Sequence, residues 1–330
     1  MTVRAATRER IEDAHRFSAF YRGSLANHLP MALVALDAMG ADDARIARYA
    51  ARHSAHLEPL ALDSVVGPAP RLGESEDFLL WLAAFRLEIL GMRRDAVLGA
   101  WIDRLAKAPG SGAFHGVIRT AFALESGSEA ELAHALAYWA AAFEPLGEAV
   151  PGAGRETPEA VLRTVHGAKA GRPVGANIAA RMKAAAALPA FDGWTAAVSP
   201  AQLDLDALAA VALHGYAATD DFTLLHAVTG CHAARRLLPF ANDPAAFVAQ
   251  LWRALVAAYV AAGAPAFETP AFAPPSDAEW PDILAHAVDC EDEHDIKLAY
   301  ACWREWQRTG DDLYRRCAAA RVAAGHPKVS

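Results

Sequence analysis

The sequence predicts an all-α protein, for three reasons. Alanine and leucine dominate the 330 residues, 54% of which are hydrophobic, while β-branched residues are sparse. No segment of four to eight residues alternates between apolar and polar side chains as a half-buried strand does. Segment ends carry helix signals: Asn27 is a capping residue shortly before Pro30, and Gly40 follows the last apolar position. A chain of this length and hydrophobicity buries a large core.

The same signals, capping residues and the 3.6-residue apolar period, predict the helices in chain order. Asn27 precedes a helix of about thirteen residues that ends at Gly40. The other expected helices span residues 6–20, 42–53, 75–90, 94–106, 111–125, 129–143, 157–166, 174–187, 204–218, 220–238, 244–262, 280–308 and 310–323.

Three stretches rich in Pro and Gly are the most loop-like: Glu144–Arg155, Leu188–Pro200 and Gly263–Pro275. Each is a possible domain boundary, but distinctive histidines lie on both sides of all three. We therefore expect one multi-helix globular domain over residues 1–330. No repeat of solenoid length is present, and the Rossmann and Walker signatures are absent, so no built-in dinucleotide site is expected.

Composition excludes several classes of partner. The formal net charge is -8, and acidic residues are scattered among basic ones, which argues against nucleic acid. The longest stretches without charged residues contain Pro and are shorter than the roughly 18 residues that a membrane span needs. The N-terminus alternates charges where a secretory signal would be apolar, so we expect a cytoplasmic protein without a membrane span. The four cysteines have no CxxC spacing, which disfavours disulfides and a cysteine zinc site.

Five of the thirteen histidines lie on apolar helix faces: His28, His115, His226, His232 and His294. His28 shares a face with apolar residues three, four and seven positions later, and His115 with those three and seven positions later. His226 and His232 are six residues apart, about 120° around an ideal helix, so both rings could flank one pocket. The alternative interpretation of each ring is a satisfied core histidine.

Lys297 lies at the edge of the apolar stripe that carries His294 on the expected helix 280–308. That stripe comprises Ile283, Ala287, Cys290, His294, Leu298 and Ala301. Burying an ammonium group is costly, and lysine responds with a lowered pKa. A neutral lysine amine reacts with carbon dioxide to give a carbamate, an anionic oxygen ligand. With imidazoles nearby, this would make a mixed site suited to iron, manganese or zinc. Alternatively, Lys297 reaches water or pairs with Glu293.

Four segments together resemble the questin oxidase-like family. They are NHLPMALVAL (27–36), AFHGVIRTAFAL (113–124) with ALAYWA (135–140), FTLLHAVTGCHAARRLLP (222–239) and DEHDIKLAYA (292–301). The resemblance implies an all-helical oxygenase that opens aromatic polyketide rings. It also implies a mononuclear non-haem iron held by four histidines and a carboxylated lysine.

Carried over by position, the resemblance assigns metal-ligand roles to five histidines and to Lys297. The five are His28, His115, His226, His232 and His294, one more than the family uses, so one of them serves beside the metal or in acid–base chemistry. His294 and Lys297 are the expected catalytic residues. Candidates for orienting ligands or meeting the substrate are Asn27, Arg119, Tyr138, Thr229 and Arg235.

Three functions remain open from sequence. The first is an Fe(II)-dependent oxygenase that acts on an anthraquinone-like or phenolic substrate with O2. The second is a flavin-free Baeyer–Villiger-type monooxygenase that draws on NADPH as external reductant. The third is a non-catalytic helical protein that binds an aromatic ligand. The expected partners are a small aromatic substrate and O2, and the sequence fixes neither the native metal nor the oligomeric state.

Overall fold

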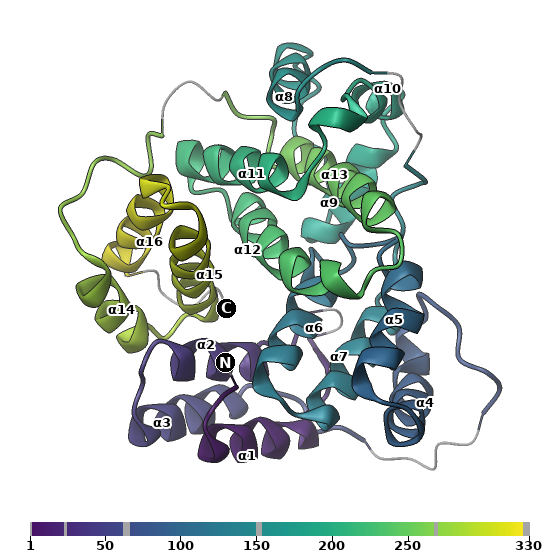
Figure 1. Cartoon of the computed structure of the whole chain (residues 1–330), viewed down its shortest axis with the longest axis vertical. Coiled ribbons are helices and arrows are strands. Elements are labelled where there is room, and N and C mark those ends of the chain that lie inside the picture. The colour runs from purple at the N-terminus through teal and green to yellow at the C-terminus, as the bar shows by residue number, and fades with distance from the viewer. Residues whose placement is uncertain (1, 23–24, 62–66, 150–153, 267–269, 326–330) are drawn as a thin grey trace. The chain divides into compact units, whose positions relative to one another are not determined.

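The computed structural model describes residues 2–22, 25–61, 67–149, 154–266 and 270–325. Within these ranges the chain forms sixteen α-helices, four short 3₁₀ helices and one hairpin of two-residue strands (Figure 1). The predicted all-α class is confirmed. His326, a histidine given no role from sequence, lies outside the described residues.

The chain divides into two compact units. The first unit comprises Met1–Val97, Ile118–Phe143 and Pro275–Ser330, and the second comprises Leu98–Val117 and Glu144–Pro274. Two of the four points where the chain passes between units coincide with predicted loops, Glu144–Arg155 and Gly263–Pro275. The other two fall inside helices α5 and α6. The expectation of one domain over 1–330 stays a prediction.

Most of the first unit is made of helices from both ends of the chain. Its elements are α1 (Ala5–Asp13), η1 (Ala14–Arg16), β1 (Phe20–Tyr21), β2 (Leu25–Ala26), α2 (Leu29–Ala38), α3 (Asp43–Ser54), η2 (Ser75–Asp77), α4 (Phe78–Gly91), α7 (Glu129–Ala141), α14 (Trp280–Asp289), α15 (Glu293–Thr309) and α16 (Asp312–Ala324). Helix α15 packs against α2, α14 and α16, and α4 packs against α7.

The second unit is built on three long helices. Its elements are α8 (Pro158–Gly167), α9 (Ile178–Ala186), α10 (Phe191–Ala196), η3 (Pro200–Gln202), α11 (Leu205–Thr219), α12 (Phe222–Leu237), η4 (Leu238–Phe240) and α13 (Pro244–Ala261). Helix α12 packs against both α11 and α13. Two further helices, α5 (Arg94–Leu105) and α6 (His115–Ser126), carry residues of both units.

The expected continuous helix 280–308 is wrong, because the chain breaks between α14 and α15. Cys290 is extended, with ψ 147°, and the Asp292 carboxylate caps α15 by accepting the backbone N–H of His294 at 2.7 Å. The guanidinium of Arg45 donates to the carbonyl oxygens of Val288 and Cys290, which the interrupted helix leaves free. The single stripe that joined Ile283 and Ala287 to His294 therefore does not exist.

Three other boundaries differ from the prediction. The expected helix 6–20 ends at Arg16, because a hairpin pairs Phe20 with Ala26. The expected helix 111–125 begins only at His115, because residues 112–114 have φ between 56° and 67°. The expected loop Leu188–Pro200 contains the short helix α10.

By length and composition alone, helix α13 could span a membrane. In the structure, 72% of this segment is buried inside the protein. A mostly buried apolar helix is what the core of a soluble protein also contains. The expected absence of a membrane span, and the cytoplasmic location, stay predictions.

A close approach between two segments of the second unit depends on Gly230 in the middle of α12. A Cβ at this position would lie 2.9 Å from Cδ1 of the Phe114 ring and 3.1 Å from its Cβ. Phe114 is fully buried and has φ 67°, so neither its ring nor its backbone has room to move. The missing side chain at Gly230 thus lets the turn before His115 lie against α12.

We expect Gly230→Ala to lower the free energy of unfolding by about 1–3 kcal/mol, because the added methyl overpacks the Phe114 contact. Chemical denaturation measures this change. Gly215→Ala is the matched control on α11, since its Cβ would meet only Leu224 at an ordinary 3.4 Å. That variant should be neutral or more stable, because alanine favours a helix by up to about 1 kcal/mol over glycine. Equal effects of the two changes would contradict the tight approach at Gly230.

A buried polar network in the first unit joins η1, α6 and α7. The guanidinium of Arg119 donates to both carboxylate oxygens of Glu131, at 2.8 and 3.2 Å, and Nε2 of His15 lies 2.8 Å from Glu131 Oε2. The His15 ring stacks on His134 at 4.1 Å. Burial, reinforced by the charge of His15, lowers the pKa of His134 to about 2. The structure buries His134 to 1% exposure.

Acidification is expected to destabilise the protein through His134. Between pH 2 and 6.5 the unfolded chain protonates this ring and the folded chain does not, so the free energy of unfolding rises with pH across that window. From pH 7 to pH 5 the loss attributable to one such histidine is about 2 kcal/mol. Between pH 7 and pH 5, the free energy of unfolding should fall by about 2 kcal/mol less in His134→Gln than in the wild type. Chemical denaturation at both pH values measures this difference. The exposed His56→Gln is the control and should behave as the wild type does; an unchanged pH dependence in His134→Gln would refute the prediction.

Candidate functional site

The first unit holds a buried pair of histidines, His28 and His294, which we call the first pair. His28 is the residue before α2 and His294 lies in the first turn of α15, two helices that pack together. Their ring centroids are 4.8 Å apart, and each side chain is 6% exposed. Ligand nitrogens of the two rings lie within 4.8 Å of each other. A metal–imidazole bond is about 2.1 Å long, so two nitrogens at such a separation need little movement to share one ion.

The second unit holds a similar pair, His115 and His226, which we call the second pair. His115 begins α6 and His226 lies in α12, and their ring centroids are 4.9 Å apart. Both rings are buried, and their ligand nitrogens also lie within 4.8 Å of each other. The edge of Phe222 packs against His226 at 4.7 Å. Four of the five predicted histidine ligands therefore form two close pairs, one in each unit.

The contacts of Nδ1 in each imidazole indicate which ring nitrogen carries the proton and which one can bind a metal. Nδ1 of His115 faces the carbonyl oxygen of Gly112, and Nδ1 of His226 faces that of Phe222 at 2.7 Å. A carbonyl only accepts, so Nδ1 carries the proton in both rings, and Nε2 keeps its lone pair. Metal-binding histidines usually show this arrangement, with the other ring nitrogen bonded to a carbonyl or carboxylate.

Carboxylates take the place of the carbonyls in the first pair. Nδ1 of His294 lies 3.0 Å from Oδ1 of Asp292, and Nδ1 of His28 lies 3.8 Å from Oε1 of Glu293. The other oxygen of Glu293 lies 3.0 Å from Nε2 of His53. Burial opposes ionisation of Glu293, but the hydrogen bond with His53 and the charge of His294 outweigh it and lower the pKa of its carboxyl to about 2.

Lys297 lies in α15, one turn beyond His294, and its side chain is 1% exposed. No hydrogen bond or ion pair joins its Nζ to another residue in the described part of the chain. Burial lowers the pKa of its ammonium to about 8, although the charges of Glu293 and Asp292 act in the opposite direction. A lowered pKa of about 8 leaves roughly one side chain in ten as the neutral amine at pH 7, compared with fewer than one in a thousand for an unperturbed lysine.

His232, the fifth predicted ligand, is buried in α12 but belongs to no group of possible metal ligands in the described residues. Thr229, predicted to orient a ligand, donates its hydroxyl to the carbonyls of Leu225 and His226 within the same helix.

The remaining predicted residues already have partners. The Asn27 amide accepts from the backbone of Leu29 and donates to the carbonyl of Ser18. Arg119 is paired with Glu131 as described, and Arg235 lies 2.8 Å from Asp206. Tyr138 is buried against Phe20, with ring centroids 4.9 Å apart, and burial raises the pKa of its phenol. Their roles toward a ligand or substrate stay predictions.

Sequence reasoning missed Asp292 and His53. Asp292 was placed inside a continuous helix, where no cap was expected, although an acidic residue two positions before a histidine is a usable signal. The side chain of His53 is buried, at 5% exposure. Its contact with Glu293 joins residues 240 positions apart, so no local pattern could have revealed it.

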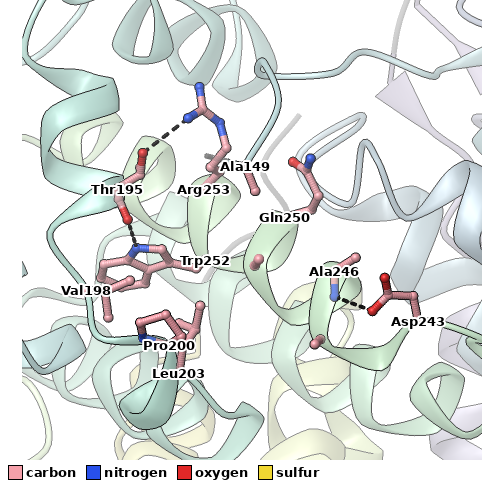
Figure 2. Close-up of a pocket in the computed structure, with 12 residues that line it drawn as sticks. Ala149, Thr195, Val198, Pro200, Leu203, Asp243, Ala246, Gln250, Trp252 and Arg253 are labelled. Atoms are coloured by element: carbon pink, nitrogen blue, oxygen red, sulfur yellow. Dashed lines mark hydrogen bonds between the residues drawn. The ribbon is translucent and has the colours of Figure 1, made fainter. Parts of the chain in front are cut away.

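A cavity of about 400 Å³ lies in the second unit beside the start of α13 (Figure 2). Its wall is mainly apolar, with Trp252, Val198 and Leu203 among its residues. The indole of Trp252 donates to the carbonyl of Thr195, and the buried Arg253 donates to the Thr195 hydroxyl. None of the predicted site residues lines this cavity, so it is separate from the second pair.

A comparison with known proteins agrees with the resemblance seen in the sequence. The family model described as Questin oxidase-like matches residues 25–302, which include both histidine pairs and Lys297. A search of curated proteins gives no match to this chain. Membership in this family suggests an oxidoreductase, an oxidase or oxygenase, that acts on aromatic polyketides. The chain belongs to the Questin oxidase-like family.

Proposed function

We propose that this chain is a metal-dependent oxygenase that acts on an aromatic polyketide or related phenolic substrate with O2. In this proposal His28, His115, His226 and His294 bind one metal ion, and Lys297 contributes a carbamate oxygen. The observation that carries the proposal is the position of Nδ1 in the four buried histidine rings. Nδ1 lies within hydrogen-bond distance of a carbonyl or carboxylate oxygen in His115, His226 and His294, and 3.8 Å from a carboxylate oxygen in His28; these contacts favour Nε2 as the ligand atom.

The donor set fits a first-row transition metal. Four imidazoles and one anionic oxygen suit Fe(II), and they also accept manganese or zinc. Iron is our choice because the resemblance to the family implies it. When bound, the metal supplies the activation of O2 toward an electron-rich ring.

Lys297 would obtain its ligand oxygen from carbon dioxide. The lone pair of the neutral Nζ forms a bond to the carbon of CO2, one C=O π bond gives its electrons to oxygen, and an Nζ proton leaves to water. The product is a carbamate with one negative charge, which removes the cost of a buried ammonium and adds an oxygen donor. Lys297 is 1% exposed and has no ion pair among the residues that the structure describes, and both observations support this proposal.

His232 would be the histidine outside the ligand set. A buried imidazole in the same helix as His226 suits acid–base work on a phenol, because one ring nitrogen can accept a proton while the other donates one. Arg119 and Arg235 are less suited to hold a substrate anion, because each already pairs with a carboxylate.

We expect the protein to be purified with about one metal ion per chain, and Lys297→Ala to lose that metal, because the carbamate oxygen is gone. Elemental analysis measures the content. Acetate or propionate added to Lys297→Ala should restore part of the metal binding by supplying a carboxylate.

Lys297→Met is the companion variant, since its side chain is apolar and similar in length. It should also lose the metal, yet its metal-free form should unfold at higher denaturant than the wild type, because no ammonium is buried. Full metal content in both variants would disprove the role of Lys297. A metal-free wild type would favour the helical binding protein over the oxygenase.

Labelled dioxygen distinguishes the two oxygenase chemistries. With a hydroxylated anthraquinone and ¹⁸O2, we expect both labelled atoms in the ring-opened product without added NADPH, as mass spectrometry would show. One labelled atom with a strict requirement for NADPH would identify the Baeyer–Villiger-type reaction instead. If the metal-loaded protein binds the anthraquinone but does not convert it, both oxygenase reactions are contradicted.

A further inference from the structure

The first turn of α15 is dense in acidic residues, and the structure divides them into two groups. Residues 291–295 read Glu-Asp-Glu-His-Asp. Two of the four acids meet arginines: Asp295 accepts from Arg321, and Glu291 lies 3.3 Å from Arg45. The other two, Asp292 and Glu293, are 2% and 3% exposed and contact the imidazoles of the first pair. Two neighbouring carboxylates are thus directed at histidines.

The contact between Asp292 and His294 does more than cap the helix. A cap requires only that the carboxylate accept a backbone N–H, which Asp292 does at 2.7 Å. The same oxygen, Oδ1, also lies 3.0 Å from Nδ1 of the His294 ring. This second contact fixes the rotation of the imidazole and favours the tautomer with the proton on Nδ1.

Glu293 is itself held in place from α3. Its Oε2 lies 3.0 Å from Nε2 of His53, and its Oε1 faces His28. The His53 ring stacks on Tyr49 at 4.6 Å, with an interplanar angle of 19°. Both rings are buried, so the stack limits the positions open to His53 and, through it, to Glu293. His53 thus acts on the first pair through its contact with Glu293.

The two pairs therefore differ in the charge around them. The second pair faces neutral backbone carbonyls, and the first pair faces two buried carboxylates. An anionic partner makes an imidazole a stronger donor, and a buried negative charge attracts a divalent cation. The first pair is the half of the ligand set with the higher affinity for a cation.

We propose that Asp292 and Glu293 are positioning residues that orient His294 and His28 and set the strength of metal binding, with His53 holding Glu293. This inference rests on the proposed function, because it assigns a role toward the metal of that site. Asp292 acts through His294, and Glu293 acts through His28.

Asp292→Asn is the decisive variant, because asparagine has the same shape and caps a helix as well as aspartate does. We expect Co(II) to bind this variant about 10- to 100-fold more weakly than it binds the wild type, the usual effect of changing such a partner. Titration of the metal-free protein with Co(II) against a competing chelator measures the affinity. The visible absorption bands of bound Co(II) should also change in position or intensity, because a neutral amide beside Nδ1 makes His294 a weaker donor to the metal than a carboxylate does.

Glu293→Gln is a second, independent variant and should weaken Co(II) binding by a similar factor. His53→Phe keeps an aromatic ring on Tyr49 but removes the hydrogen bond to Glu293, so a smaller, several-fold loss is expected. Asp295→Asn is the matched control: it removes a buried acid of the same turn that pairs with Arg321. It should lower the melting temperature and leave Co(II) affinity within twofold of the wild type.

The outcomes separate this inference from the proposed function. Wild-type affinity in both Asp292→Asn and Glu293→Gln, with a wild type that binds one Co(II), would overturn the positioning role alone. A wild type that takes up no Co(II) would overturn the metal site and this inference with it. A loss in Asp295→Asn as large as that in Asp292→Asn would show that the first turn of α15 acts only through stability, which also overturns the inference.

Discussion

The start of α15 in the first unit depends on the contacts that the Asp292 carboxylate makes with His294. One oxygen accepts both the backbone N–H and the ring Nδ1 of His294, so the start of α15 and the orientation of a histidine are set together. The helix that would otherwise run on from α14 stops here. Arg45 stabilises the interruption, because it satisfies carbonyl oxygens that lose their helical partners.

The same physical rule explains the other polar groups in the core. A buried nitrogen or oxygen without a partner costs about 1–3 kcal/mol, and Nδ1 of His115, His226 and His294 each lies beside an oxygen acceptor. The acceptors for the second pair are backbone carbonyls of the local turn or helix. The acceptor for His15 is Glu131, which also neutralises the buried guanidinium of Arg119. Nζ of Lys297 makes no hydrogen bond or ion pair within the described residues, and a buried amine in this state is a sign of chemistry.

A glycine and a run of positive φ angles also help to place His115. His115 follows three residues with positive φ, and the turn that they form lies against α12 only because residue 230 has no side chain. The glycine was visible in the sequence, but its partner Phe114 lies 116 positions away. Volume matching of this kind is decided by packing and leaves no local periodic signal.

The sequence by itself determined the all-α class, most helix positions, the five inward-facing histidines and the unusual lysine. These follow from local rules, since apolar period and capping residues act within a few positions of the chain. Tertiary structure alone decided which histidines pair, that His53 supports Glu293, and that a helix expected over 280–308 breaks in two. Those outcomes depend on contacts between residues as many as 266 positions apart, such as His28 and His294. Burial and hydrogen bonding across such separations override what the local pattern favours.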